Sequence, residues 1–104
     1  MRDKTRYLLY VLEGQRLDEK SVRLAVRRAV YSFLGEKGAS EANVKLMEFD
    51  HNGQKFLVRC TLAAVESTIA ALAFCTSFNT SPLALRLQKM SGGVKHVWSS
   101  KRKP

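Results

Sequence analysis

The residues of this chain that could do chemistry are its cations: Lys and Arg total 18 against 9 for Asp and Glu, a formal net charge of +9. So large a positive excess on a small surface attracts polyanions, of which nucleic acid is the commonest. No acidic residue interrupts the stretch from Lys20 to Leu34, so its cations form either a solvated helix face or a ridge that follows phosphates. The candidate phosphate contacts are Lys20, Arg23, Arg27, Arg28, Lys55, Arg59, Arg86, Lys89, Lys95, Lys101, Arg102 and Lys103.

The residues that could catalyse a reaction do not form a constellation. His51 and His96 have no carboxylate or cysteine spaced to them as a motif, and the chain has no P-loop, no GxGxxG run and no metal-ligand cluster. Arg16 lies where acylphosphatases place an anion-binding arginine, but the surrounding G-Q-R-L does not match their loop. Cys60 and Cys75 are expected to be two buried thiols. We therefore expect no catalytic residue, no metal ligand and no cofactor in the protein itself.

Two N-terminal elements should position the first cations. Arg6–Leu12 is a short apolar run with aromatic and β-branched members, which favours a buried strand ending near Gly14. Leu17–Leu34 is expected to be a helix with Asp18 as its N-cap and Ser21 as a weaker alternative. Gly35 and Gly38 should end it, because Gly is common just past a helix C-terminus. Its apolar stripe, which leaves the cations on the remaining faces, comprises Val22, Ala25, Val26, Ala29, Val30 and Phe33.

A β-hairpin over Asn43–Thr61 is predicted from Asn52-Gly53, the dipeptide most typical of a two-residue type I′ turn. That turn would pair Asp50 with Lys55 and fix the register of both strands. The further expected pairs are Phe49–Phe56, Glu48–Leu57, Met47–Val58 and Leu46–Arg59. Because side chains alternate between faces, the first and third of these pairs should face the core. The others, with Asp50 and Lys55, should face water or a partner.

The C-terminal half should add a second helix and a last strand. Leu62–Phe78 contains one charge, Glu66, and is apolar nearly all round, which indicates burial on more than one side. Leu83–Met90 alternates as a half-buried strand, and a short helix over Val94–Ser99 would precede the basic end. We expect the second apolar side of the Leu62–Phe78 helix to contact another protein, with a candidate interface of Ala70, Ala71, Phe74 and Cys75.

The order strand, helix, strand, strand, helix, strand predicts an α+β fold of ferredoxin-like or RRM-like type, a split βαβ sandwich. It would have a four-stranded antiparallel sheet with two helices on one face, plus a short C-terminal helix or tail. RNA-recognition motifs carry aromatic residues on the third strand, where this chain has Lys55, Leu57 and Arg59. RNA binding would therefore use phosphates and RNA structure rather than stacked bases.

Residues 1–104 should form one domain, with 1–5 as an N-terminal arm and 91–104 as a basic C-terminal segment. The hydrophobic share of 45% supports a core, and no apolar run reaches the roughly 18 residues of a membrane span. The charged N-terminus has too short an apolar run for a signal peptide, so we expect a cytoplasmic location and no membrane partner.

Three stretches resemble the archaeal ribonuclease P protein component 2 family, which is similar to a eukaryotic subunit of the same enzyme. They are R-Y-L-L-Y at Arg6–Tyr10, L-M-E-F-D-H-N-G-Q-K-F-L-V-R-C at Leu46–Cys60 and K-M-S-G-G-V-K at Lys89–Lys95. Their order and spacing span nearly the whole chain. Gly93 departs from the small polar residue expected there, and the C-terminal helix is shorter than is usual in the family.

The resemblance implies a protein subunit of a ribonucleoprotein that removes the 5′ leader from precursor tRNA, with catalytic Mg²⁺ held by the RNA subunit. It also implies that the chain binds ribonuclease P RNA, pairs with protein component 3 in a heterotetramer, and meets precursor tRNA only indirectly. The residues alone leave two alternatives open. One is a generic ferredoxin-like RNA-binding or ribosome-associated protein, and the other is a small-molecule-binding regulatory domain whose apolar helix forms a homodimer.

Overall fold

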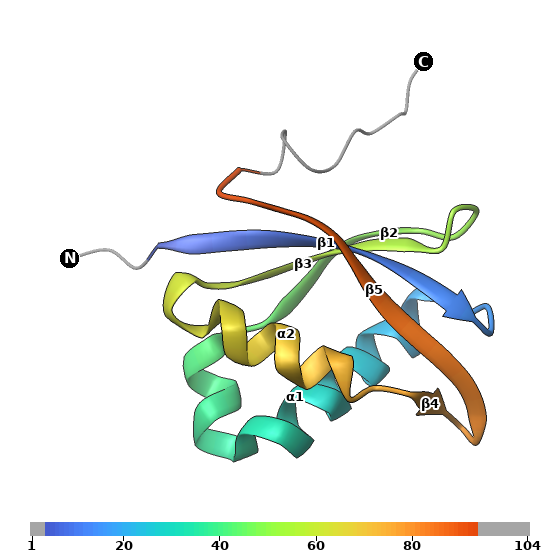
Figure 1. Ribbon diagram of the computed structural model, residues 1–104, viewed down its shortest axis with the longest axis horizontal. Helices are drawn as coiled ribbons and strands as arrows, with labels where there is room; N and C mark the ends of the chain where they lie inside the picture. Colours follow the sequence, from blue (N-terminus) through green and yellow to red (C-terminus); the bar gives the residue numbers. More distant parts are fainter. Residues whose placement is uncertain (1–3, 94–104) are drawn as a thin grey trace.

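The computed structural model describes residues 4–93, which form helices on one side of an antiparallel sheet (Figure 1). The strands are β1 (Thr5–Gly14), β2 (Lys45–Asp50), β3 (Lys55–Thr61), β4 (Ser77–Phe78) and β5 (Ser81–Ser91). The helices are α1 (Glu19–Ala42) and α2 (Val65–Ala73), with a 3-10 turn at Leu62–Ala64 leading into α2. The longer elements follow the predicted order strand, helix, strand, strand, helix, strand, so the α+β class is confirmed.

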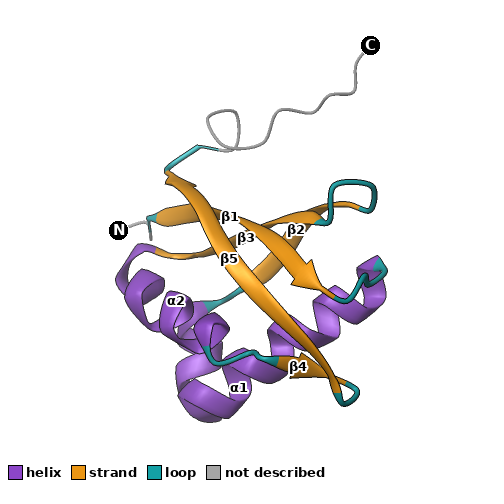
Figure 2. Cartoon of the chain, turned by 45° about the vertical axis from the view of Figure 1, so that its right-hand side comes forward, coloured by secondary structure: helices purple, strands orange, loops and turns teal. Residues whose placement is uncertain are grey.

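The sheet has the strand order β2-β3-β1-β5-β4, and both helices lie on the same face of it (Figure 2). It has five strands and not the four expected, because α2 ends at Ala73 instead of continuing to Phe78. Ser77 and Phe78 then pair with Pro82 and Ser81 as a short edge strand. We call the face under the helices the inner face of the sheet, and the opposite one the outer face.

The inner face supplies most of the core. Leu8, Tyr10 and Leu12 of β1 point to it and are buried, and the Tyr10 ring stacks on Phe56 of β3 with centroids 5.5 Å apart. The predicted stripe of α1 packs against these residues, except that its last member, Phe33, is 45% exposed. The intervening residues of β1 point to the outer face and are Tyr7, Leu9 and Val11.

Helix α1 begins as predicted and ends later than predicted. The Asp18 carboxylate accepts a hydrogen bond from the Ser21 N–H at 2.9 Å, which confirms the N-cap. At Gly35 the backbone takes φ 77° and ψ 177°, values that are essentially confined to glycine. Helical turns resume after this kink and run to Ala42, where Asn43 closes them with φ 50°. Neither helix of the described part is long and apolar enough to cross a membrane.

The β2–β3 turn differs from the one predicted. The expected pairs Asp50–Lys55, Phe49–Phe56 and Glu48–Leu57 are present. Positive φ, however, occurs at Gln54, at 52°, and at neither Asn52 nor Gly53. Gln54 is buried and its side chain is fully engaged. Its Oε1 accepts from the Leu17 N–H at 2.9 Å, and its Nε2 donates to the His51 carbonyl at 2.8 Å. The turn is thus shaped by an attachment to the start of α1.

A two-residue turn with positive φ at both central residues occurs instead between β4 and β5. Asn79 and Thr80 have φ values of 51° and 70°, and Phe78 pairs with Ser81 across them. Gln15 donates to the carbonyls of Phe78 and Ser81 at 2.9 and 3.0 Å. These bonds tie the β4–β5 turn to the loop between β1 and α1.

A β-bulge in β2 changes which side chains face the core. The pairing skips Met47, so Leu46 lies opposite Val58 and Lys45 opposite Arg59. The expected Met47–Val58 and Leu46–Arg59 pairs are therefore wrong: Leu46 packs against the core and Met47 is 40% exposed. An extra residue in one strand turns the neighbouring side chains to the other face, and here it places Lys45 on the outer face.

A second bulge, in β5, acts in the same way. The pairing with β1 shifts between Leu9 and Tyr10, so that Tyr10 lies opposite Leu87 and Leu9 opposite Lys89. Gln88 is the extra residue. Without the bulge Lys89 would share the face of Leu87, whereas the shift turns it to the outer face.

Candidate nucleic-acid interface

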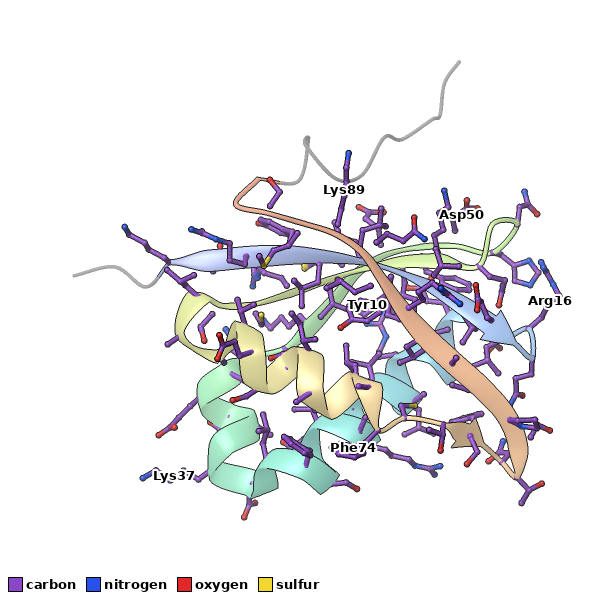
Figure 3. The ribbon with its side chains drawn as sticks, in the orientation of Figure 1. Tyr10, Arg16, Lys37, Asp50, Phe74 and Lys89 are labelled. Carbon is purple, nitrogen blue, oxygen red and sulfur yellow. The ribbon has the colours of Figure 1, made fainter. Side chains whose placement is uncertain are left out.

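The outer face of the sheet gathers the strand cations that the sequence singles out. Lys55 and Arg59 of β3 lie opposite outward-facing residues of β1, and so do Arg86 and Lys89 of β5. The Lys89 side chain projects from β5 away from the helices (Figure 3). All four candidates therefore share one surface, although they come from two strands that are not neighbours.

Acidic and apolar side chains share this outer face and reduce its net charge. Arg86 donates to the Glu13 carboxylate at 3.1 Å, so its charge is already compensated. Glu48 and Asp50 of β2 also face outward in the observed register. Leu57, at the centre of the face, is fully buried, and Leu9 and the partly buried Tyr7 of β1 pack against it.

The four helix cations lie on different sides of α1 and do not form one ridge. Arg23 and Arg27 line a groove between α1 and β2, whereas Arg28 lines a groove between α1 and α2. Lys20 is exposed near the start of α1 and lines neither groove. Successive helix residues point about 100° apart, which is why Arg27 and Arg28 diverge.

The first groove, which we call the edge groove, lies between α1 and the outer edge of β2 and has a volume of about 400 Å³. β2 is the last strand in the sheet order, and among the described residues it pairs with β3 alone. No carboxylate belongs to the described lining, although Arg23 bonds to Glu19 at 2.7 Å outside it. The polar lining residues are Arg23, Arg27, Tyr31, Ser40, Asn43 and Lys45.

Lys45 is the candidate that sequence reasoning missed. In the predicted register it would lie opposite Cys60 on the inner face. The bulge at Met47 places it opposite Arg59 on the outer face, and at this strand edge it also belongs to the lining of the edge groove. Leu46 and Met47 are both apolar, so the alternation of the sequence carries no signal for the bulge.

The second groove, which we call the helix groove, lies between α1 and α2 and has a volume of about 590 Å³. Phe33 and Phe74 stack there with ring centroids 5.2 Å apart, and they are 45% and 70% exposed. The Arg28 guanidinium lies 5.7 Å from the centroid of the Phe78 ring. The groove is lined by residues that include Arg28, Ser32, Phe33, Phe74, Cys75 and Phe78.

The four protein-interface candidates have different surroundings in this region. Phe74 and Cys75 line the helix groove, and Phe74 projects on the helix side of the molecule (Figure 3). Ala71 is fully buried in the core, so it supports the groove wall and offers no side chain to a partner. Ala70 is half-buried and lies outside the groove lining.

The titratable groups of the core are held in their neutral forms. Burial, with a smaller effect of Cys60, raises the pKa of Tyr10 to about 12. Burial likewise raises the pKa of the Cys60 and Cys75 thiols. Arg16 is engaged with the His51 carbonyl at 2.8 Å. Residues 4–93 contain no group of three or more metal-ligating side chains.

Several predictions of the sequence lie outside the described residues. They concern the short helix over Val94–Ser99 and the tail cations Lys95, Lys101, Arg102 and Lys103, all of which stay predictions. Of the expected N-terminal arm, 1–5, the structure describes Lys4 and Thr5, and Thr5 already begins β1.

A small α+β domain with a basic groove, a sheet face rich in cations and an exposed aromatic groove has the features of a nucleic-acid-binding protein that also contacts a protein. The chain belongs to the Rpp14/Pop5 family, whose model matches residues 6–100. Two relatives named Ribonuclease P protein component 2, from Pyrococcus furiosus and Pyrococcus horikoshii, are 28% and 30% identical over 98 residues. Each match covers 93% of this chain and 82% of the relative. A third, from Methanocaldococcus jannaschii, is 28% identical over 91% of this chain and 70% of the relative.

The fold is also similar to a chain in the cryo-EM structure of yeast ribonuclease MRP. The TM-score is 0.73, and the match covers 97% of this chain and 82% of that chain at 12% identity. At this identity the likeness concerns the fold alone. The family match and the archaeal relatives together confirm the resemblance found in the sequence.

Proposed function

We propose that the chain is a protein subunit of the ribonuclease P ribonucleoprotein, where it binds and stabilises the catalytic RNA domain for 5′-leader removal from precursor tRNA. The observation that carries this proposal is the family match over residues 6–100, with relatives named Ribonuclease P protein component 2. The match to these relatives covers 93% of this chain, so the similarity extends over nearly all of it. The proposal places it in the cytoplasm.

In this proposal the reaction belongs to the RNA and the protein acts by charge. Mg²⁺ is expected at the RNA subunit, and the protein supplies cations that neutralise phosphates where RNA segments are folded together. Neutralisation by fixed lysines and arginines releases counterions and lowers the Mg²⁺ that the RNA core needs in order to fold. The protein itself needs no cofactor for this role, and precursor tRNA meets it only indirectly.

The proposed phosphate contacts of the described part lie on two surfaces. The outer face offers Lys55, Arg59 and Lys89, with Arg86 weakened by its bond to Glu13. The edge groove offers Arg27 and Lys45, with Arg23 weakened by its bond to Glu19. Lys20, Arg28 and the tail residues Lys95, Lys101, Arg102 and Lys103 complete the set.

The proposed protein partner is ribonuclease P protein component 3, in a heterotetramer, and the helix groove is its proposed docking site. Exposed aromatic side chains in a concave apolar setting are typical centres of protein interfaces. Phe74 is 70% exposed and stacks on Phe33 beside the groove, an arrangement that is costly in water and favourable under a partner.

The test is reconstitution of precursor-tRNA cleavage from the RNA subunit and component 3, with and without this chain. We expect the chain to raise the cleavage rate at low Mg²⁺ and to lower the Mg²⁺ concentration at half-maximal rate. No change in either quantity would reject the proposal and favour a general RNA-binding protein. Cleavage by the purified chain in the absence of RNA subunit would also reject it, because the reaction would then belong to the protein.

A further inference from the structure

We propose that the edge groove binds a single-stranded segment of RNA, with phosphates at Arg23, Arg27 and Lys45 and a base on Tyr31. This inference rests on the proposed function, which requires RNA binding, and adds where an unpaired strand lies. The outer face, by contrast, would contact folded RNA through its more widely spread cations.

Charge is the first argument. The edge groove has cations on both walls, Arg23 and Arg27 from α1 and Lys45 from β2, and no carboxylate in its described lining. The carboxylate nearest to these cations is Glu19, which bonds to Arg23 from outside the lining and leaves Arg27 and Lys45 as the uncompensated charges of the described lining. The outer face mixes its cations with Glu13, Glu48 and Asp50. Low-dielectric walls and one sign of charge concentrate the field inside a groove, so the edge groove attracts anions more strongly than its number of cations suggests.

Spacing is the second argument. Arg23, Arg27 and Tyr31 follow one another at four-residue intervals, which puts them in a row along α1 with about 6 Å of rise between neighbours. A strand lying along this row would meet two cations and then an aromatic ring, and Tyr31 is 49% exposed. Grooves that bind single strands combine cations that track the backbone with aromatic rings on which bases stack.

Shape favours an unpaired strand over a duplex. The groove is sunk between α1 and the edge of β2, with Ser40 and Asn43 among its lining. A duplex presents its phosphates on a convex surface and reaches side chains mainly across its wide minor groove, whereas a single strand can enter a concave site and expose its bases. Ser40 and Asn43 can hydrogen-bond to base edges or to 2′-hydroxyls.

An extended acidic peptide is the competing occupant, because the outer edge of β2 offers unpaired backbone groups. Two features of β2 oppose such strand addition. The bulge at Met47 interrupts the regular edge, and Lys45 lies on it. Bulges and lysines are the devices by which sheet edges resist pairing with another strand. The groove is therefore suited to phosphates more than to a peptide backbone.

The test measures binding of the full chain to a fluorescent ten-nucleotide oligouridylate and to a duplex of the same length. The variants are Arg27→Glu, Lys45→Glu and Tyr31→Ala. The matched control is Lys37→Glu, which makes the same charge change on α1 beyond the kink, on a side chain that is 90% exposed (Figure 3). Circular dichroism melting of each variant verifies that it is folded.

We expect each charge reversal in the groove to weaken oligouridylate binding roughly tenfold and to reduce the salt slope by about 0.7. Tyr31→Ala should weaken binding at least about fivefold with an unchanged slope, because stacking releases no counterions. Lys37→Glu should stay within about twofold. Groove variants that bind oligouridylate as well as the unmodified chain, or as well as Lys37→Glu, would overturn the inference. So would equal affinity for the duplex.

An oligoglutamate peptide identifies the competing occupant. If the groove variants lose the peptide and keep oligouridylate, the groove is a peptide site and the inference is wrong. The cleavage assay separates this failure from failure of the proposed function: groove variants that bind oligouridylate normally leave the function intact if the chain still stimulates cleavage. Conversely, a chain without effect on cleavage whose groove still binds oligouridylate rejects the function and keeps the site.

The bound strand could belong to the RNA subunit or to the leader of the substrate. Placing 4-thiouridine in single-stranded parts of either RNA, in the assembled ribonucleoprotein, distinguishes the two by photo-crosslinking. A crosslink to the peptide containing Arg27 and Tyr31 from one of these RNAs identifies the source, and a crosslink from the leader would also overturn the proposal that precursor tRNA meets the chain only indirectly. No crosslink to this peptide from either RNA would overturn the inference in the assembled particle.

Discussion

The edge groove and the helix groove lie on two sides of α1 and use neighbouring positions of the same helix. Arg27 lines the first and Arg28 the second, and Tyr31 and Phe33 divide in the same way. The edge groove has cations and hydrogen-bonding side chains. The helix groove has stacked phenylalanines, which make an apolar wall with a single cation in it.

The difference between the grooves teaches how one helix can meet two kinds of partner. Contacts to phosphates work from partly exposed side chains, are sensitive to salt, and need little buried area. Apolar contacts need a well-packed concave site and are insensitive to salt. The two modes do not compete on α1, because its cations and its exposed aromatic residues point in different directions.

A change in salt concentration should give the largest difference in binding between the two grooves. With about six phosphate contacts, log affinity for RNA should fall against log salt with a slope of roughly −4 to −5. Raising the salt from about 50 to about 200 mM would then weaken RNA binding roughly 250- to 1000-fold. Binding of component 3 should change by less than about threefold, because an apolar contact releases few counterions. Fluorescence anisotropy for RNA and calorimetry for component 3 measure the two; a parallel loss would mean that the helix groove is not an apolar interface.

The helix groove should be testable by comparing Leu72 of α2 with Phe74, the residue that follows the last turn of this helix. Leu72 is fully buried, and Leu72→Ala should lower the free energy of unfolding by about 2–5 kcal/mol. Phe74 is 70% exposed, so Phe74→Ala should cost about 1 kcal/mol or less, mainly its stacking on Phe33. The same variant should weaken component 3 binding by about 2 kcal/mol or more. Urea unfolding and calorimetry measure these quantities.

The control for this prediction is Glu66→Ala, an exposed change on α2 that should alter neither quantity. If Phe74→Ala binds component 3 as tightly as Glu66→Ala, the partner docks elsewhere. RNA affinity should be the same for all three variants, and a loss confined to Phe74→Ala would assign RNA to the helix groove.

The kink at Gly35 should affect one groove only. Its φ and ψ lie in a region that other residues rarely enter, so Gly35→Ala should cost about 1–3 kcal/mol of unfolding free energy, although the added methyl group meets nothing within 4 Å. Ser40 and Asn43 follow the kink and line the edge groove, whereas Ser32 precedes it and lines the helix groove. We therefore expect Gly35→Ala to weaken oligouridylate binding and to leave component 3 binding unchanged.

Glu36→Ala is the neighbouring control, since Glu36 is exposed and next to the kink. Equal melting temperatures for Gly35→Ala and Glu36→Ala would mean that the helix can straighten without cost. In that case the kink would not be what positions Ser40 in the edge groove.

The elements that the sequence predicted well are those set by local patterns. The four-residue spacing of Val22, Val26 and Val30 indicates the buried side of α1, and a single carboxylate, Asp18, marks its start. The order of the longer helices and strands along the chain follows from the same patterns. The angles of successive residues around α1 also predict which cations share a side of the helix. The groove that each side faces is known only once the elements packed against α1 are known.

The parts that sequence reasoning missed depend on residues far apart in the chain. The turn after β2 takes its shape from Gln54, whose side chain bonds to Leu17 at a separation of 37 residues. This long-range attachment overrides the local preference of Asn52-Gly53. The bulge that turns Lys45 outward lies at Met47, next to the equally apolar Leu46, so the hydrophobic pattern does not show which of the two faces the core. The edge groove could not be predicted, because it forms where α1 packs beside the edge of β2, which is a contact between separate elements.

The smallest effect should come from the N-cap of the helix that carries both grooves. Hydrogen bonds from the Ser21 side chain and backbone hold the pKa of the Asp18 carboxyl below its ordinary value of 3.8. A lowered pKa stabilises the fold above the ordinary value, and this contribution is lost as the pH falls through the folded-state pKa. Asn caps a helix about as well as Asp but carries no charge, so Asp18→Asn removes only the ionic part.

The melting temperature of Asp18→Asn should therefore lie slightly below that of the unmodified chain from pH 7 to about pH 5, and the difference should vanish between about pH 4 and pH 2. A difference that persists at pH 2 would mean that the charge of Asp18 is not its source. Because Asp18 lines neither groove, binding of oligouridylate and of component 3 should be unchanged at pH 7. A loss of either would mean that binding in both grooves depends on the stability of α1 as a whole. The different composition of the groove walls would then explain less of the binding than the helix that the grooves share.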